Sequence, residues 1–361
     1  MTDITLPAAP RPEGKTDALS LTPEELTAYI LSLDQPKYRA AQIFPLLSRG
    51  IPFAEMTNLP KDLRARLSEE CLDTLPQVEK KLVSAIDGTV KYLFRLYDGA
   101  CVESVLMRYE HGNSLCISSQ VGCRFCASTI GGKVRDLLPS ELLGQVIAAQ
   151  KDSGERVSNI VMMGIGEPLD NFDNVVRFLH LVNREEGLCI GYRHISLSTC
   201  GLADRIYDLA RLDLPITLSI SLHAPTDEQR AAIMPINRRY PLGDLFAACR
   251  DYYKATGRRI SFEYTLIAGK NDTPADAAAL ADCLTRAFRG TGAPLHVNLI
   301  RVNEVEGTGF TRGSRESVNA FAAALEKRGI VATVRRRLGA DVNAACGQLR
   351  RSAAKEQGEQ A

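Results

Sequence analysis

The chain has 361 residues, of which 45% are hydrophobic and 24% are charged, and its formal net charge is +1. This length suits one large domain or two smaller ones, and the composition is typical of a soluble globular protein. The sequence has no apolar run of about 18 residues, which argues against a membrane-spanning helix, and the near-zero net charge favours no class of partner.

The amino-terminal part of the chain begins with polar residues, and we expect 1–18 to form a disordered tail. Residues 19–78 then carry three helical patterns. The first follows Thr22, a residue type that caps helices, and starts with Pro23 and two glutamates. The stretches KYRAAQIFPLLSRG and TNLPKDLRARLSEECL have apolar residues at helical spacing. These patterns predict a small helical module.

Residues 79–113 change to short β-rich runs separated by Asp-Gly and His-Gly-Asn turns, which predict β-hairpins. Between 114 and 340, strand-like runs alternate with helix-like segments such as 139–152 and 274–288. This alternation predicts a parallel α/β domain, closed or partly closed as a barrel, and a polar tail, 341–361, follows it. The strand-like runs are 114–118, 158–163, 194–199, 216–222, 260–266, 295–300 and 330–334.

The loops that follow these strands are rich in glycine, cysteine and charged residues. They read SSQVGCRFC, GIGEPLDN, TCGL, HAPTDEQR, AGKND and RVNEVEG. Ligands of parallel α/β sheets bind at the carboxyl ends of the strands, so we expect these loops to assemble one site.

Cys123 and Cys126, in the first of these loops, form a C-x-x-C pair. Ten cysteines without a secretory leader predict a reducing, cytoplasmic compartment, where cysteines more often bind metals or lie buried than form structural disulfides. Zinc would need two more ligands, and the five histidines show no suitable pairing. A thioredoxin-like redox pair matches the context poorly. The pair alone leaves an iron–sulfur cluster and two free thiols as open interpretations.

The loop GIGEPLDN, 164–171, shifts this balance. Its glycines allow a ligand to approach the backbone closely, and Glu167 offers a carboxylate to an ammonium or hydroxyl group. Because it follows another strand of the same domain, the two loops together favour a cluster beside an S-adenosylmethionine site.

The order of the motifs resembles that of the radical S-adenosylmethionine RNA methyltransferases of the RlmN/Cfr family, which modify an adenine base. The resemblance extends over nearly the whole chain and implies a partial (β/α)6 radical SAM barrel after an RNA-binding helical accessory module. The matching stretches are KYRAAQIF, MTNLPKDLR, DGTVKYLFRL, VESVLM, LCISSQVGC, FCAS, GIGEPLDN, LSTCG, SISLHAP, NLIRVN and NAACGQLR.

The same resemblance implies the cofactors and partners. These are a [4Fe–4S] cluster, S-adenosylmethionine used twice in each turnover, 23S ribosomal RNA and transfer RNA as substrates, and an electron donor such as flavodoxin or ferredoxin. It implies a monomer with no membrane association. Arginine clusters at 238–239, 258–259, 335–337 and 350–351 are candidates for contacting RNA phosphates.

Matched residue by residue, the resemblance also implies roles. Cys346 corresponds to the cysteine that is methylated first, Cys116 to the cysteine that later forms a disulfide with it, and Glu103 to the general base. The implied product is adenine methylated at C2 through the methylated cysteine, and methylation at C8 is an alternative. The positions implied to bind S-adenosylmethionine are Gly166, Glu167, Ser198, Ser221, Leu222, His223 and Asn303, and those implied to bind the cluster are Cys123 and Cys126.

The cluster loop departs from the family pattern, in which three cysteines follow SQVG. Here SQVG leads directly into CRFC, so the loop looks shortened by four residues and has one cysteine fewer. A cluster that leaves one iron to the cosubstrate needs three protein thiolates. The nearest other cysteine, Cys116, precedes Cys123 by seven residues and already matches another role. A family member that binds RNA or S-adenosylmethionine without catalysis is therefore a further alternative.

Overall fold

The helical module lies where its patterns predict it. The computed structural model describes residues 14–72, 74–123, 132–302, 311, 313–336 and 338–342. Thr22 caps the first helix in a reciprocal pair with Glu25, whose backbone N–H lies 3.2 Å from the threonine hydroxyl. The helices are α1 (Pro23–Ser32), α2 (Tyr38–Leu47) and α3 (Lys61–Glu70), with short 3-10 turns η2 (Ala18–Ser20) and η3 (Phe53–Glu55).

The expected tail at 1–18 extends too far, because its last residues belong to the fold. Thr16 pairs with Cys71 in a β-bridge, and Asp17 is fully buried. The Asp17 carboxylate accepts hydrogen bonds from the hydroxyls of Ser20, at 2.6 Å, and Ser140, at 2.7 Å. These contacts tie residues 16–18 to α3 and to the start of α4 (Pro139–Ser153).

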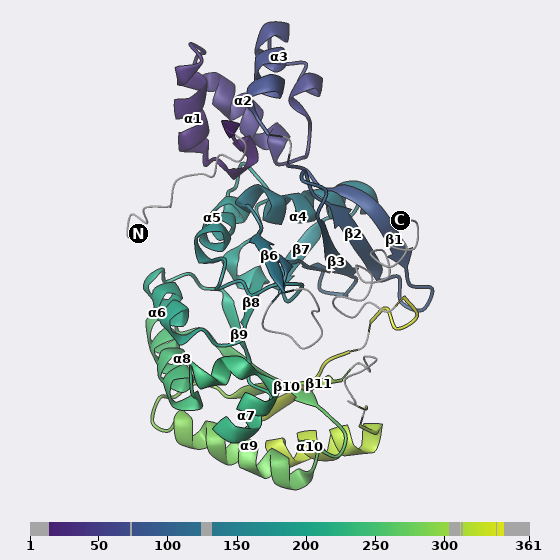
Figure 1. Cartoon of the computed structure of the whole chain (residues 1–361), viewed down its shortest axis with the longest axis vertical. Coiled ribbons are helices and arrows are strands. Elements are labelled where there is room, and N and C mark those ends of the chain that lie inside the picture. Colours follow the sequence, from purple (N-terminus) through teal and green to yellow (C-terminus); the bar gives the residue numbers. More distant parts are fainter. Residues whose placement is uncertain are drawn as a thin grey trace.

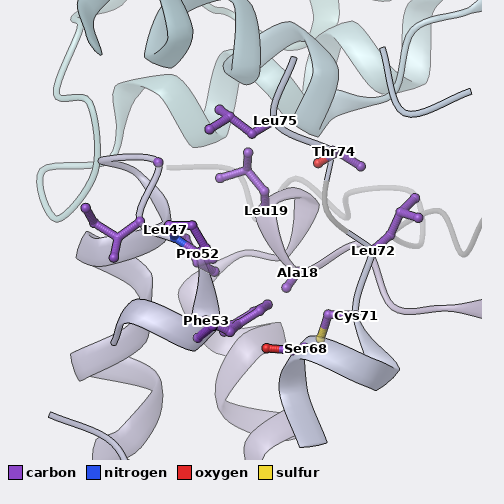
Figure 2. Close-up of a pocket in the computed structure, with 13 residues that line it drawn as sticks. Ala18, Leu19, Leu47, Pro52, Phe53, Ser68, Cys71, Leu72, Thr74 and Leu75 are labelled. Atoms are coloured by element: carbon purple, nitrogen blue, oxygen red, sulfur yellow. The ribbon is translucent and has the colours of Figure 1, made fainter. Parts of the chain in front are cut away.

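The helical module also docks on the rest of the protein through α5 (Phe172–Asn183). The buried Arg177 donates to the carbonyl of Ser20 and to the carboxylate of Glu25, both at 3.0 Å. An apolar pocket of about 170 Å³ lies beside this contact, with Leu19, Phe53 and Leu75 in its wall (Figure 2). In Figure 1 the three helices stand together at the top of the view, above α4.

Ten strands form one sheet, in the order β1-β2-β3-β4-β7-β8-β9-β10-β11-β12. The first four are antiparallel neighbours, as the hairpin signals predict, and every pairing from β4 to β12 is parallel. The strands are β1 (Gln77–Val83), β2 (Val90–Arg95), β3 (Cys101–Met107), β4 (Asn113–Cys116), β7 (Val157–Met162), β8 (Ile195–Thr199), β9 (Thr217–Ser221), β10 (Ile260–Leu266), β11 (His296–Arg301) and β12 (Val331–Val334).

Each parallel strand from β4 to β11 is followed by at least one helix, and β12 ends the series. This confirms a partial (β/α)6 barrel, whose sheet edges among the described strands are β1 and β12 (Figure 1). In the part of the chain that the structure describes, no helix has the length and apolar character to cross a membrane. The remaining helices are α6 (Ala203–Arg211), α7 (Asp227–Ile233), α8 (Leu242–Thr256), α9 (Pro274–Ala287) and α10 (Arg315–Glu326), with turns η4 (Tyr192–His194) and η5 (Pro235–Arg238).

The two faces of this sheet differ in chemistry, because alternate residues of a strand point to opposite faces. One face is apolar and forms the core, with residues such as Leu115, Leu197 and Phe262 fully buried. The strand registers place the polar residues together on the other face, which we call the polar face. Its members are Lys91, Glu103, Cys116, Ser196, Ser198, Ser219, Ser221, Ser261, Glu263, His296, Asn298 and Thr333.

Candidate active site

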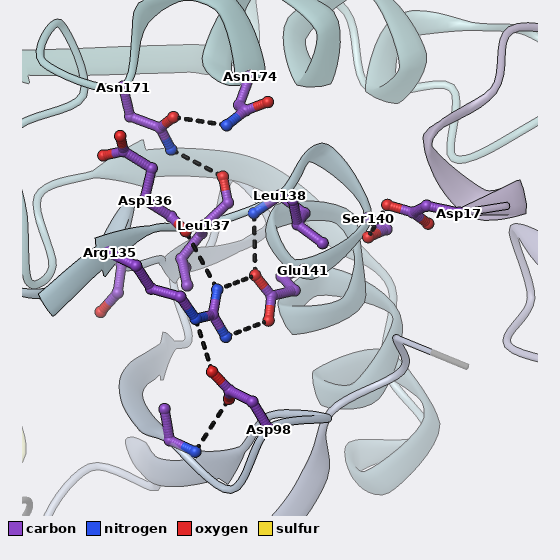
Figure 3. A network of polar contacts seen from close by, with 12 residues as sticks. Asp17, Asp98, Arg135, Asp136, Leu137, Leu138, Ser140, Glu141, Asn171 and Asn174 are labelled. Carbon is purple, nitrogen blue, oxygen red and sulfur yellow. Dashed lines mark hydrogen bonds and ion pairs between the residues drawn. The ribbon is translucent and has the colours of Figure 1, made fainter. Parts of the chain in front are cut away.

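The cysteine loop grows from a small hairpin of β5 (Gln120–Gly122) and β6 (Lys133–Asp136) between β4 and α4. Arg135 holds this hairpin (Figure 3). Its guanidinium binds the buried carboxylate of Glu141 at 2.7 and 2.8 Å, and it binds Asp98 at 2.7 Å. A two-point contact between a guanidinium and a buried carboxylate fixes orientation as well as position. The start of the loop at Cys123, itself buried, is therefore firmly placed.

A second set of contacts joins this hairpin to the loop after β7. The side-chain amide of Asn171 donates to the carbonyl of Ser119 at 2.9 Å. It also donates to the carbonyl of Leu137 at 2.8 Å (Figure 3). The amide of Gln120 donates to Asp170 at 2.9 Å. The cysteine hairpin and the GIGEPLDN loop, predicted from sequence to share a site, thus pack as one unit.

Gly166 permits this packing. It has a φ of +111°, and a Cβ atom there would lie 2.6 Å from the hydroxyl of Ser119 and 2.7 Å from the backbone nitrogen of Gln120. The close approach therefore joins two protein loops, in addition to any ligand contact that the sequence predicts. Where they meet, the Ser119 hydroxyl oxygen is buried without a hydrogen-bond partner among the described residues. Such an oxygen is suited to a polar ligand.

Glu167 joins the loops after β7 and β8. Its carboxylate accepts from the backbone N–H of Cys200 at 2.6 Å and from that of Leu169 at 3.0 Å. Burial raises the pKa of this carboxyl, and the Cys200 N–H opposes the rise. The side chains of Cys200 and Thr199 also hydrogen-bond this buried carboxylate, so Glu167 ties the loops after β7 and β8 together.

Arg230, on α7, braces the ends of β8 and β9. It is fully buried and donates to the carbonyls of Cys200, at 2.6 Å, Ser221, at 3.0 Å, and Leu222, at 3.2 Å. Sequence reasoning missed this residue, since an arginine in the short segment HAPTDEQR carries no signal of burial. Ser198 and Ser221 are half-buried on the polar face, while the Leu222 side chain lies in the core.

His223 follows β9 in a left-handed backbone conformation, with φ +60°. Its Nδ1 accepts a hydrogen bond from the backbone N–H of Thr265 at 3.1 Å. Burial, assisted by the positive charge of Arg230, lowers the pKa of the imidazole to about 4. The ring is therefore neutral at pH 7 and carries its proton on Nε2, which can donate to a ligand.

Glu103 and Cys116 lie on neighbouring strands, as their implied roles require. Glu103 on β3 forms an ion pair with Lys91 on β2 at 3.2 Å, and both side chains are almost fully buried. Cys116, at the end of β4, is also buried and is a free thiol. Burial raises its pKa, and the charges of Arg335 and Lys91 oppose that rise. Lys91 was not foreseen from the sequence, where it interrupts the apolar strand TVKYLF.

Three residues with expected roles lie outside the described residues. These are Cys126, Asn303 and Cys346.

Comparisons with known proteins match both parts of the chain. Residues 120–281 match the radical SAM superfamily, and residues 16–72 match the ribosomal RNA large subunit methyltransferase N-terminal domain. The chain is 50% identical over 342 residues to the probable dual-specificity RNA methyltransferase RlmN of Alkaliphilus oremlandii, covering 93% of this chain and 98% of the relative. The chain belongs to the RlmN family of radical SAM RNA methyltransferases. The corresponding RlmN of Desulforamulus reducens is 51% identical over 346 residues, covering 94% and 97%.

A solved structure agrees with this RlmN-family assignment. A radical SAM methyltransferase from Sphaerobacter thermophilus has a TM-score of 0.85 and 42% identity, covering 92% of this chain and 98% of its own. The resemblance stated from sequence motifs is thus confirmed.

Membership of the RlmN family implies S-adenosylmethionine and a [4Fe–4S] cluster. The described residues fit S-adenosylmethionine, because the unsatisfied Ser119 hydroxyl and the half-buried Ser198 and Ser221 offer polar groups at or near the carboxyl ends of the strands.

The cysteine loop alone does not fit the cluster, because it supplies two thiolates where three are needed. Among the residues that the structure describes, no three histidine, cysteine or carboxylate side chains are placed to hold a metal ion together. Cys200 is buried in the loop after β8. Burial raises the pKa of its thiol, and the negative charges of Glu167 and Cys123 raise that pKa further. Cys116 instead lies beside Glu103.

Proposed function

We propose that this chain methylates C2 of an adenine in 23S ribosomal RNA, and in transfer RNA, with S-adenosylmethionine as the methyl source and a methylated cysteine as the intermediate. The observation that carries the proposal is the grouping of Glu103, Lys91 and Cys116 on the polar face, which also carries Ser198 and Ser221. RlmN relatives named as dual-specificity RNA methyltransferases support it at about half identity over most of the chain.

In this proposal each of the grouped residues has a separate task. Cys346 carries the methyl group to the base; a radical that the cosubstrate would supply when bound at the cluster would remove one hydrogen atom from that methyl group, and the cluster would accept the electron left over once the carbon has joined the ring. Glu103 takes the proton that leaves the ring carbon. The Cys116 thiolate then attacks the sulfur of Cys346, so that a disulfide forms and the carbon–sulfur bond to the base breaks with its electron pair on the product carbon, which takes up a proton to complete the methyl group. Lys91, 3.2 Å from Glu103, balances the buried carboxylate while it waits for the proton.

The cosubstrate in this proposal lies along the ends of the parallel strands. Gly166 and Glu167 receive its amino-acid part, and Ser198 and Ser221 its polar groups. The Nε2–H of His223 donates to an acceptor atom of the same ligand, and the implied Asn303 completes the set. An adenine inside a duplex cannot reach this face, so the base enters unpaired or flipped out. The helical module holds the RNA, and a flavodoxin or ferredoxin supplies electrons to a monomer in the cytoplasm.

The test is anaerobic reconstitution with iron and sulfide, followed by methylation of 23S ribosomal RNA that lacks the modification. The proposal requires about four irons per chain, which the two thiolates of the cysteine loop can hold only with a third ligand from elsewhere in the fold. It also requires a reduced spectrum that changes when S-adenosylmethionine is added, and 2-methyladenosine by nucleoside mass spectrometry. Glu103→Gln and Cys116→Ala should bind the same amount of iron and release no product. Absence of bound iron and of product would contradict the proposal and favour a binding protein, and 8-methyladenosine would contradict the position.

A further inference from the structure

A pocket of about 300 Å³ opens beside the last strands of the barrel. It lies at the carboxyl ends of β11 and β12 and against the first turns of α10, which is the end of the strands where the candidate active site assembles. Four arginines line it, from three different elements: Arg301 ends β11, Arg335 and Arg336 follow β12, and Arg315 starts α10.

The positive charge of this pocket is concentrated. None of the four arginines of this pocket takes part in an ion pair between described residues. By contrast, Arg239 in another basic cluster faces Asp204 at 3.9 Å. The amino-terminal end of α10 also points its helix dipole toward the pocket, although its first turn is capped by Ser314 and carries the acidic Glu316. Guanidinium groups bind phosphate in two-point contacts, and Arg301, Arg315 and Arg336 line one side of the pocket with three of them.

Arg335 connects this pocket to the polar face. Its backbone N–H donates to the carbonyl of Leu299 at 2.9 Å, which continues the pairing of β12 with β11. Its side chain reaches Met163, just after β7, and its charge acts on both Cys116 and Glu263. By strand alternation, Arg301, Val334 and Arg336 point to the α10 side of the sheet, whereas Arg335 points to the polar face. A group bound in the pocket would therefore lie across the end of the sheet from the surface where Cys116 and Glu103 are grouped, with Arg335 between the two.

We propose that this pocket binds a backbone phosphodiester of the substrate RNA, at a nucleotide beside the target adenine, and that Arg335 sets the distance between that phosphate and the polar face. The proposal rests on the proposed function, since it names the part of the RNA that this site holds. The proposal assigns a phosphate contact to one of the basic clusters noted in the sequence and not to another. Arg335 and Arg336 line the pocket, whereas Arg258 and Arg259 precede β10, at the opposite end of the strands.

The test compares Arg301→Gln and Arg336→Gln with Arg259→Gln, an exposed arginine at the far end of the sheet. Binding of an unmodified RNA hairpin is measured by fluorescence anisotropy over a range of potassium chloride concentrations. Each contact with a phosphate contributes about 0.7–0.9 to the slope of log affinity against log salt. We expect each pocket variant to lower the slope by about that amount and to weaken binding several-fold at low salt, while the control keeps the wild-type slope.

Further measurements separate the possible failures. Circular dichroism and urea unfolding of each variant check that the fold is unchanged, and the double variant Arg301→Gln/Arg336→Gln should lose about twice the slope. Inorganic phosphate should compete better with RNA for the wild type than for the double variant. Pocket variants that bind RNA like the control would overturn this proposal and leave the proposed function standing. A wild-type protein that binds no RNA at any salt concentration would overturn both.

Discussion

Replacing Lys91 by methionine tests the buried ion pair next to the candidate thiol. The substitution keeps a flexible side chain of similar length and removes the positive charge. Glu103 would then be left as a buried carboxylate with 4% of its side chain exposed. Leaving one charge of a buried pair without its partner is among the most destabilising changes known for single residues.

The size of the effect follows from the geometry of the pair. Unit charges separated by 3.2 Å attract each other by about 5 kcal/mol at an effective dielectric constant of about 20. Measured losses for broken buried pairs are about 3–5 kcal/mol. We therefore expect Lys91→Met to lower the free energy of unfolding by about that amount. The double variant Lys91→Met/Glu103→Leu should recover most of the loss, since no buried charge remains.

Urea unfolding followed by circular dichroism measures these differences. Lys81→Met is a matched control on the neighbouring strand β1, because the Lys81–Asp152 pair is partly exposed at 36% and 26%. It should cost less than about 1 kcal/mol. If Lys91→Met proved no more costly than Lys81→Met, the reasoning that Lys91 balances a buried Glu103 would be refuted.

Three further substitutions or titrations probe other parts of the site. Gly166→Ala should destabilise the protein by more than the about 1–2 kcal/mol expected for a left-handed residue alone, because the new Cβ would lie 2.6 Å from Ser119. Gly154→Ala, whose Cβ would have nothing within 4 Å, should cost only that amount. Equal losses of unfolding free energy in urea would contradict the packing argument. Burial raises the pKa of Asp17 from 3.8 to about 6, so its contribution to stability is fully present below pH 3.8 and is lost as the pH rises through 6. The unfolding free energy should therefore fall by about 1–2 kcal/mol between pH 5 and 7.5. Asp17→Asn should remove this pH dependence. The pKa of His223 is lowered from 6.5 to about 4, so its contribution to stability is present above pH 6.5 and is lost as the pH falls toward 4. The ring proton resonance of His223 should titrate near pH 4 by NMR. A midpoint near 6.5 would show that the imidazole is solvated.

Much of the fold could be predicted because its signals are local. The Thr22 cap and the three helical patterns place α1, α2 and α3 within a few residues of their observed bounds. The alternation of apolar strands and amphipathic helices after residue 114 gives the barrel, since a parallel strand needs a crossover connection to reach its neighbour. The tail boundary at residue 18 was wrong because the Thr16 bridge and the burial of Asp17 depend on partners far along the chain.

The chemistry of the site was predictable only in part. Motif resemblance predicted roles for Glu103 and Cys116, and the structure places the two residues on neighbouring strands. Lys91 and Arg230 escaped prediction because burial of a charged side chain depends on what the fold places around it. Arg230 is buried because three carbonyls from the loops after β8 and β9 converge on its guanidinium, a feature that no short sequence pattern reports.

The short cysteine loop and the rest of the site are structurally separable. Arg135, Glu141 and Asn171 clamp the hairpin at its base, outside the residues that the loop lacks, so the site can assemble without them. Those contacts require only β5, β6, the first turn of α4 and the loop after β7. Iron binding, by contrast, depends on the thiolates of Cys123 and Cys126 and on what the neighbouring loops add. This fold is therefore consistent with a protein that folds and binds S-adenosylmethionine and RNA but holds little iron. For that reason iron content has to be measured on its own, alongside RNA binding and product.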